Sequence, residues 1–283
     1  MQVELAGNYE AQWGEGPIWY DNVLYYVDIE GHKVIRFDPA TGDERIYDVG
    51  ERVGTVVPRA KGGLVIAGDT GFHFLDSESG ELTAIADPEP EIETNRFNDG
   101  KCDPSGRFWA GTISTNKTTG AARLYCLDAQ LKVSEKFGPV TNSNGICWSL
   151  DAATMYYIDT PRKQVLAFDF DNAAGEITNE RVVIDTQEIT GSPDGMTIDA
   201  EGMLWVAFCR GSNVHRFDPA TGKMTNSIEL PCTGVTAVAF GGPNMDVLYV
   251  TTGKFSNAPE TGDGRLYMVH LDVHGQASFA FSG

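Results

Sequence analysis

The chain has 283 residues, of which 41% are hydrophobic, and its formal net charge is −19. This acidity repels phosphate backbones and anionic lipid headgroups, so we expect neither nucleic acid nor a membrane surface as a partner. No apolar run approaches the length of about 18 residues that a membrane-spanning helix needs. The first five residues lack the basic start and apolar run of a secretory signal, so we expect a cytoplasmic protein.

A sixfold repeat organises the chain. Each copy predicts three strands: an apolar, glycine-marked strand, a strand rich in aromatic and β-branched residues, and a strand that ends in a turn at aspartate. The first strands are predicted over 14–19, 53–59, 98–103, 144–150, 194–199 and 235–240. The second strands are predicted over 23–29, 63–67, 107–112, 155–160, 203–208 and 247–252, and the third over 34–38, 72–76, 123–128, 165–169, 214–218 and 266–272.

The spacers between repeats leave room for a fourth, outer strand in each copy. Six four-stranded units of this kind are typical of a β-propeller. We therefore predict an all-β fold, a six-bladed β-propeller with a central channel, which forms a single domain over residues 1–283. Because a ring has to be closed by its chain ends, we expect the segments 3–5 and 278–281 to pair in one blade.

The residues that begin the first strands are expected to ring the channel, because the first strand of a propeller blade lies innermost. Two carboxylates and two carboxamides among them form an oxygen-only donor set, which suits Ca²⁺, Mg²⁺ or Mn²⁺ better than Zn²⁺. Carboxylates in a narrow channel would be costly without a cation. The alternative is that these residues serve turns, because glycine follows Asn98, Asn144 and Asp194 within two positions. The ring positions are Glu15, Thr55, Asn98, Asn144, Asp194 and Thr236.

Two long loops are predicted above this ring, at 114–122 and 253–264. Both join a second strand to a third strand, and the alternation of strand direction brings such loops to the same end of the channel as the ring. Both contain glycine. They are candidates for lids over a site, with ordinary surface loops as the alternative.

Signatures of several other enzyme classes are missing. The chain has no Gly-x-Ser-x-Gly elbow, no His-Glu-x-x-His helix, no phosphate-binding loop and no dinucleotide fingerprint. The five histidines fall on third strands or surface turns, away from the predicted channel. The five cysteines form no Cys-x-x-Cys pair, so neither a zinc site nor a disulfide framework is expected.

At its glycine-marked strands the sequence resembles the senescence marker protein-30, gluconolactonase and luciferin-regenerating enzyme family. The resemblance is carried by GEGPIW at 14–19, NRFNDGK at 95–101, SNGICWS at 143–149, PDGM at 193–196 and FGG at 240–242. It implies that Glu15, Asn144 and Asp194 bind one divalent metal ion. Calcium is the expected ion, with manganese, magnesium, zinc and iron as alternatives. Asp194 would also be the general base, and Arg96 and Asn98 would hold the substrate.

The resemblance further implies metal-dependent hydrolysis of small lactones, most readily aldonolactones such as gluconolactone. Family members often carry an acidic substrate contact on the lid after a Gly-Thr pair. Here Gly111 and Thr112 are followed by Ile113, Ser114, Thr115 and Asn116, so the expected carboxylate is missing. The alternative functions are organophosphate triester hydrolysis at the same site and a non-catalytic calcium-binding propeller with a protein partner. For Arg96, the alternative role is a structural ion pair with a channel carboxylate.

Overall fold

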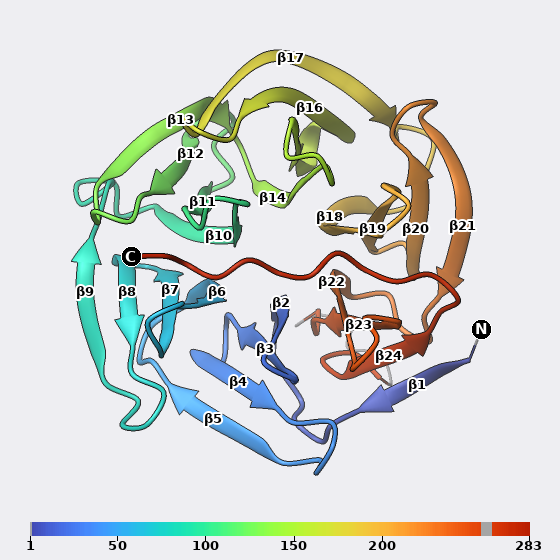
Figure 1. Cartoon of the computed structure of the whole chain (residues 1–283), viewed down its shortest axis with the longest axis horizontal. Helices are drawn as coiled ribbons and strands as arrows, with labels where there is room; N and C mark the ends of the chain where they lie inside the picture. Colours follow the sequence, from blue (N-terminus) through green and yellow to red (C-terminus); the bar gives the residue numbers. More distant parts are fainter. Residues whose placement is uncertain (1, 256–261) are drawn as a thin grey trace.

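The chain folds into six four-stranded sheets arranged as blades around a central channel (Figure 1). The computed structural model describes residues 2–255 and 262–283. The predicted six-bladed β-propeller is therefore confirmed, and helical structure in the described part of the chain amounts to one 3₁₀ turn, η1 Thr160–Arg162. None of the described helices is long and apolar enough to cross a membrane.

Each blade is built from the channel outward, so the first strand of every repeat lies innermost (Figure 1). The innermost strands are β2 Gly14–Tyr20, β6 Val53–Pro58, β10 Asn95–Cys102, β14 Ser143–Trp148, β18 Ser192–Ile198 and β22 Val235–Gly241. The second strands are β3 Val23–Asp28, β7 Leu64–Gly68, β11 Phe108–Ser114, β15 Thr154–Asp159, β19 Leu204–Cys209 and β23 Val247–Thr252.

The third and outer strands complete the blades. The third strands are β4 Lys33–Phe37, β8 Gly71–Leu75, β12 Ala122–Leu127, β16 Gln164–Asp171, β20 Asn213–Asp218 and β24 Leu266–His270. The outer strands are β5 Glu44–Asp48, β9 Leu82–Ala86, β13 Val133–Val140, β17 Glu176–Asp185, β21 Lys223–Glu229 and, from the N-terminus, β1 Val3–Ala6. The outer strands β17 and β21 are mostly polar and exposed, as expected for strands of which only one edge is paired.

The N-terminal strand completes the last blade of the ring. β1 pairs antiparallel with β24, with Val3 opposite Val269, and so becomes the outer strand of the blade that the last strands of the chain build. The expected pairing of 278–281 in the same blade is wrong. Because β1 already occupies the free edge of β24, the C-terminal segment takes a different path.

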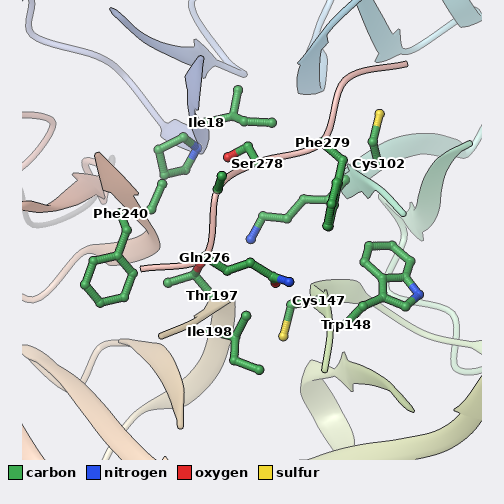
Figure 2. Close-up of a pocket in the computed structure, with 14 residues that line it drawn as sticks. Ile18, Cys102, Cys147, Trp148, Thr197, Ile198, Phe240, Gln276, Ser278 and Phe279 are labelled. Carbon is green, nitrogen blue, oxygen red and sulfur yellow. The ribbon is translucent and has the colours of Figure 1, made fainter. Parts of the chain in front are cut away.

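That segment, the C-terminal strap (residues 275–283), crosses one end of the channel (Figure 1). Its backbone amide at Gln276 donates to Ile198 O at 3.3 Å, and at the far side Phe281 donates to Pro58 O at 2.8 Å. The strap closes a cavity of about 40 Å³, and Gln276 and Ser278 line it together with Thr197 and Cys147 from the innermost strands (Figure 2).

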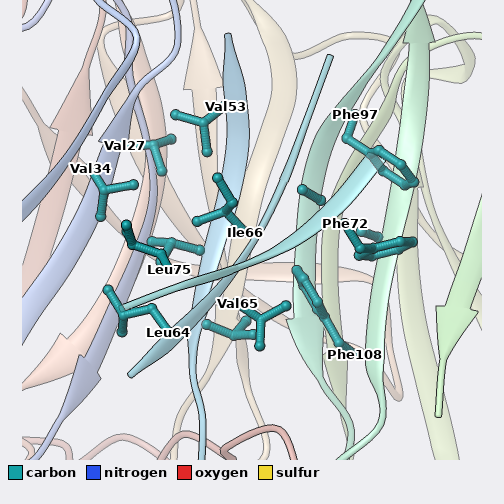
Figure 3. Close-up of a cluster of buried hydrophobic side chains, with 14 of the residues drawn as sticks. Val27, Val34, Val53, Leu64, Val65, Ile66, Phe72, Leu75, Phe97 and Phe108 are labelled. Atoms are coloured by element: carbon teal, nitrogen blue, oxygen red, sulfur yellow. The ribbon is translucent and has the colours of Figure 1, made fainter. Parts of the chain in front are cut away.

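Apolar side chains pack between neighbouring blades and form most of the core. Around the second blade, Val27 of β3 lies on one side and Phe97 of β10 on the other, with Ile66 and Phe72 between them (Figure 3). The rings of Phe72 and Phe97 lie 4.6 Å apart between centroids. Each blade therefore holds its neighbour in place, and the channel geometry follows from this packing.

Substitution of Phe281 tests whether the strap contributes to this core. Its side chain is 0% exposed and belongs to the cluster between the first three blades. Phe281→Ala should lower the free energy of unfolding by about 3–5 kcal/mol, because it leaves a cavity in close-packed surroundings. Urea denaturation would measure this, with Leu150→Ala as a control at an exposed apolar side chain. Equal stability of the two variants would show that the strap is not part of the core.

Candidate active site

A β-bulge interrupts the innermost strand of every blade at the same level of the channel. Each innermost strand has one more residue there than its partner, as between Phe97 and Gly100 in β10 or between Pro193 and Met196 in β18. A bulge turns side chains away from strict alternation. All predicted ring positions lie within or beside these bulges: Glu15, Thr55, Asn98, Asn144, Asp194 and Thr236.

Glycine next to the ring residues lets the innermost strands approach one another. A Cβ atom on Gly145 would lie 2.7 Å from Asp194 O, and one on Gly195 would lie 2.7 Å from Ala237 Cα. Both distances are too short for any other residue. The glycines of the Asn-Gly and Asp-Gly pairs thus allow close packing around the channel. The alternative that these pairs form turns is wrong, because they lie within the strands β14 and β18.

Three carboxylates lie buried together at this level. Glu15, Asp99 and Asp194 are each at most 7% exposed. Burial, reinforced by the charge of Asp99, raises the pKa of Glu15 to about 8. Burial and the charges of Glu15 and Asp99 raise the pKa of Asp194 well above its ordinary value. These carboxylates therefore repel one another in a place where water screens them poorly.

A hydrogen-bond chain fixes the carboxamide of Asn144. Its Nδ2 donates to Thr160 Oγ1 at 2.7 Å, and that hydroxyl donates to Pro193 O at 3.0 Å. Because Thr160 must accept from the amide, Asn144 presents its oxygen toward the channel, where Asn98 Nδ2 donates to it at 3.0 Å. Thr160, the first residue of η1, thus orients a predicted metal ligand from the neighbouring loop.

Arg96 and Asn98 are linked directly. One guanidinium nitrogen of Arg96 donates to Phe97 O at 2.8 Å and to Asn98 Oδ1 at 2.9 Å. Asn98 Nδ2 also donates to Ser143 O at 2.7 Å, so both of its amide hydrogens are in use. Within residues 2–255 and 262–283, Arg96 forms no ion pair, which disfavours a purely structural ion pair as its role.

The donor set fits a hard cation. Asp194 Oδ1 is buried and has no hydrogen-bond partner among the described residues, and the same holds for Asp99 Oδ2. A buried oxygen of this kind needs a partner that the protein does not supply. In the described part of the chain, no three histidine, cysteine or acidic side chains converge to hold an ion by themselves, so the carboxamide of Asn144 would have to complete the set of Glu15 and Asp194.

The structure brings all five predicted site residues to one end of the channel: Glu15, Arg96, Asn98, Asn144 and Asp194. Sequence reasoning missed two neighbours. Asp99 directly follows a predicted ring position but is not one itself, and Thr160 is only the last residue of the strand predicted over 155–160. The bulge in β10 was the missing signal for Asp99, since strict alternation would turn it away from Asn98.

The two predicted lids differ in what can be described. The loop after β11 is tied to the rim, since Thr115 N donates to Thr94 O at 2.7 Å and Gly120 N donates to Thr141 Oγ1 at 3.0 Å. Of the loop at 253–264, residues 256–261 lie outside the described part of the chain. A lid function for either loop stays a prediction.

Comparisons with known proteins match this chain to one family over most of its length and to solved structures of the same fold. A family model described as the SMP-30/Gluconolactonase/LRE-like region matches residues 13–254. Regucalcin of Danio rerio is 39% identical over 294 residues, which cover 100% of this chain and 99% of regucalcin. YvrE of Bacillus subtilis, named as a sugar lactone lactonase, is 35% identical, with 100% and 99% covered. A solved Agrobacterium tumefaciens structure, described as the calcium-binding protein regucalcin, has a TM-score of 0.93 at 27% identity, with 98% and 96% covered.

The buried carboxylates predict how stability depends on pH when metal is removed. The pKa of Glu15 is about 8 in the folded chain against an ordinary 4.5, so the folded state holds a proton that the unfolded state has released. The stability from this proton is present below about pH 4.5 and is lost as the pH rises through about 8, by about 1.4 kcal/mol per pH unit in that window.

Urea unfolding of chelator-treated protein across this window would measure the slope. Glu15→Gln is the matched control, because it keeps the shape of the side chain and removes the titrating group. We expect a shallower slope in this variant. Stability that is flat or rises with pH in the wild-type chain would contradict the arrangement described above.

Proposed function

Because the chain belongs to the SMP-30/gluconolactonase/LRE-like family, we propose that it is a metal-dependent hydrolase of small lactones, with aldonolactones such as gluconolactone as the favoured substrates. One observation carries the proposal. Two buried carboxylates and an oriented carboxamide converge at one end of the channel, and one carboxylate oxygen, Asp194 Oδ1, has no partner among the described residues. A channel of this kind favours a small polar ligand over a macromolecule.

Glu15, Asn144 and Asp194 would hold the divalent ion, and calcium is favoured because all donors are hard oxygen atoms. When bound, the ion would offset the charge of the carboxylates, polarise the lactone carbonyl and stabilise the negative charge that develops on its oxygen. The described relatives are consistent with this, since one of them is named a calcium-binding protein and another a sugar lactone lactonase.

Asp194 would act as the base. Its carboxylate takes a proton from water, and the oxygen of that water forms a bond to the carbonyl carbon of the lactone. The ring carbon–oxygen bond then breaks, the proton passes from Asp194 to the departing ring oxygen, and the product is a hydroxy acid. Asp194 would return to its ionised form without any co-reactant.

Arg96 would bind and orient the substrate. Among the described residues, only one of its guanidinium nitrogens has hydrogen-bond partners, so several N–H groups remain for hydroxyl or carbonyl oxygens of a polyol. Asn98 has no amide hydrogen left and would offer only the second lone pair of its oxygen. Its contribution would therefore be mainly to hold Arg96 and Asn144 in position.

Asp194→Asn should abolish lactone hydrolysis, because it removes the base while keeping the shape of the side chain. We expect a loss in kcat of about 10²–10⁴-fold or more, measured by titrating the acid released from gluconolactone. Asp272→Asn, at an exposed carboxylate, is the control for a lost surface charge. Turnover at the wild-type rate by Asp194→Asn would rule out this role.

Removal of divalent ions should also abolish turnover. After chelation and dialysis, lactone hydrolysis should fall to the uncatalysed rate and return when calcium, magnesium or manganese is added singly. The ion that restores the highest kcat/KM identifies the preferred metal. Full activity in the stripped protein, with metal content checked by elemental analysis, would exclude a metal-dependent mechanism.

A further inference from the structure

After Asn98, the innermost strand β10 carries one acidic and one basic residue, Asp99 and Lys101. We propose that these two residues set the cation affinity of the Glu15, Asn144 and Asp194 site in opposite directions, Asp99 strengthening it and Lys101 weakening it. The inference rests on the proposed function, because it concerns the same site. Neither residue need touch the ion, so both are positioning residues that act through their charge.

Asp99 is held in the channel by the bulge in β10. Its side chain is 5% exposed, and its Oδ1 accepts a hydrogen bond from its neighbour Gly100 N at 2.7 Å. Its Oδ2 is buried without a partner among the described residues. The charge of Asp99 acts on both Glu15 and Asp194, so it lies close to both predicted ligands. A carboxylate in this place favours any cation bound above it.

The proposed ligand set does not include Asp99. Over residues 2–255 and 262–283, no three acidic, histidine or cysteine side chains converge closely enough to hold an ion. Its effect on a bound cation must therefore act through space or through water. An unpartnered, buried oxygen at this position is suited to accept a hydrogen bond from a water molecule that lies between it and the ligand set.

Lys101 is anchored across the channel. Its Nζ donates to Met196 O of β18, two blades further along the ring, so the ammonium group is held against β18 instead of against Asp99. In the described part of the chain Lys101 forms no ion pair, although its charge acts on both Asp99 and Glu15. Because the two charges do not neutralise each other in direct contact, each keeps its own effect on the site above.

Lys101 also lines the cavity of about 40 Å³ under the strap. Gln276 and Ser278 of the strap lie on the same cavity (Figure 2). A space of this size has room for roughly one to three water molecules, which would solvate the ammonium group from below. Strap residues Gln276 and Ser278 thus line the same cavity as Lys101, so the ammonium group has polar surroundings on this side.

Calorimetric titration of the metal-stripped, full-length protein with calcium tests the inference. At a separation of several ångströms, one buried charge changes the affinity for a divalent ion by roughly ten- to a hundredfold. Asp99→Asn should raise Kd by at least about tenfold and Lys101→Met should lower it by a similar factor. The double variant should return to within about threefold of the wild type, because the two changes of charge cancel.

Thermal unfolding of the metal-free proteins supplies a readout that does not depend on the ion. Asp99→Asn should raise Tm, because it relieves repulsion among the carboxylates, and Lys101→Met should lower it. Lys33→Met is the matched control, since Lys33 forms an ion pair with Asp48 at the surface and should leave calcium Kd unchanged. Lys101→Arg and Asp99→Glu keep the charges and should bind calcium within about threefold of the wild type.

The outcomes separate this inference from the proposed function. If the wild type binds calcium but both charge variants shift Kd in the same direction, or neither shifts it, the inference is overturned and the metal site stands. If Lys101→Met does not fold, Asp99→Asn still tests the inference, because an unchanged calcium Kd in that variant overturns it. If the wild type binds no divalent ion, the proposed metal site fails, and this inference fails with it.

Discussion

Mutual repulsion among Glu15, Asp99 and Asp194 is the interaction on which the other features of this channel depend. Burial raises the pKa of each, and each lies in the field of at least one other. Such an arrangement is unfavourable in the absence of a counter-charge. A bound cation or protons on the carboxylates can offset the repulsion.

The fold is held together by packing between blades. Every innermost strand is held between two neighbouring blades, and pairing of β1 with β24 ties the start of the chain to the blade that its last strands build. The strap adds a second closure, since it joins the fifth blade at Ile198 to the second blade at Pro58 across the channel. Repulsion in the channel is therefore balanced by apolar burial elsewhere.

The six bulges connect this packing to the chemistry. A regular strand would alternate its side chains between two faces, so that Asn98 and Asp99 could not both serve the channel. One extra residue in each innermost strand lets polar side chains face the channel at the bulge, while the rest of the strand keeps its alternation of faces. Glycine is required next to these bulges at Gly145 and Gly195. The innermost strand of the next blade lies so close there that a Cβ atom would clash with it.

The sequence was enough to predict the six-bladed propeller, because the repeat period and the strand pattern are local or recur at a fixed spacing. It was also enough to predict that Glu15, Asn98, Asn144 and Asp194 lie together, because each stands at the start of a first strand. The path of the strap, the orienting role of Thr160 and the positions of Asp99 and Lys101 were decided by the tertiary structure alone. Each depends on a contact between segments far apart in the sequence or on a one-residue change of register. Contacts and register changes of this kind leave no periodic signal in the sequence.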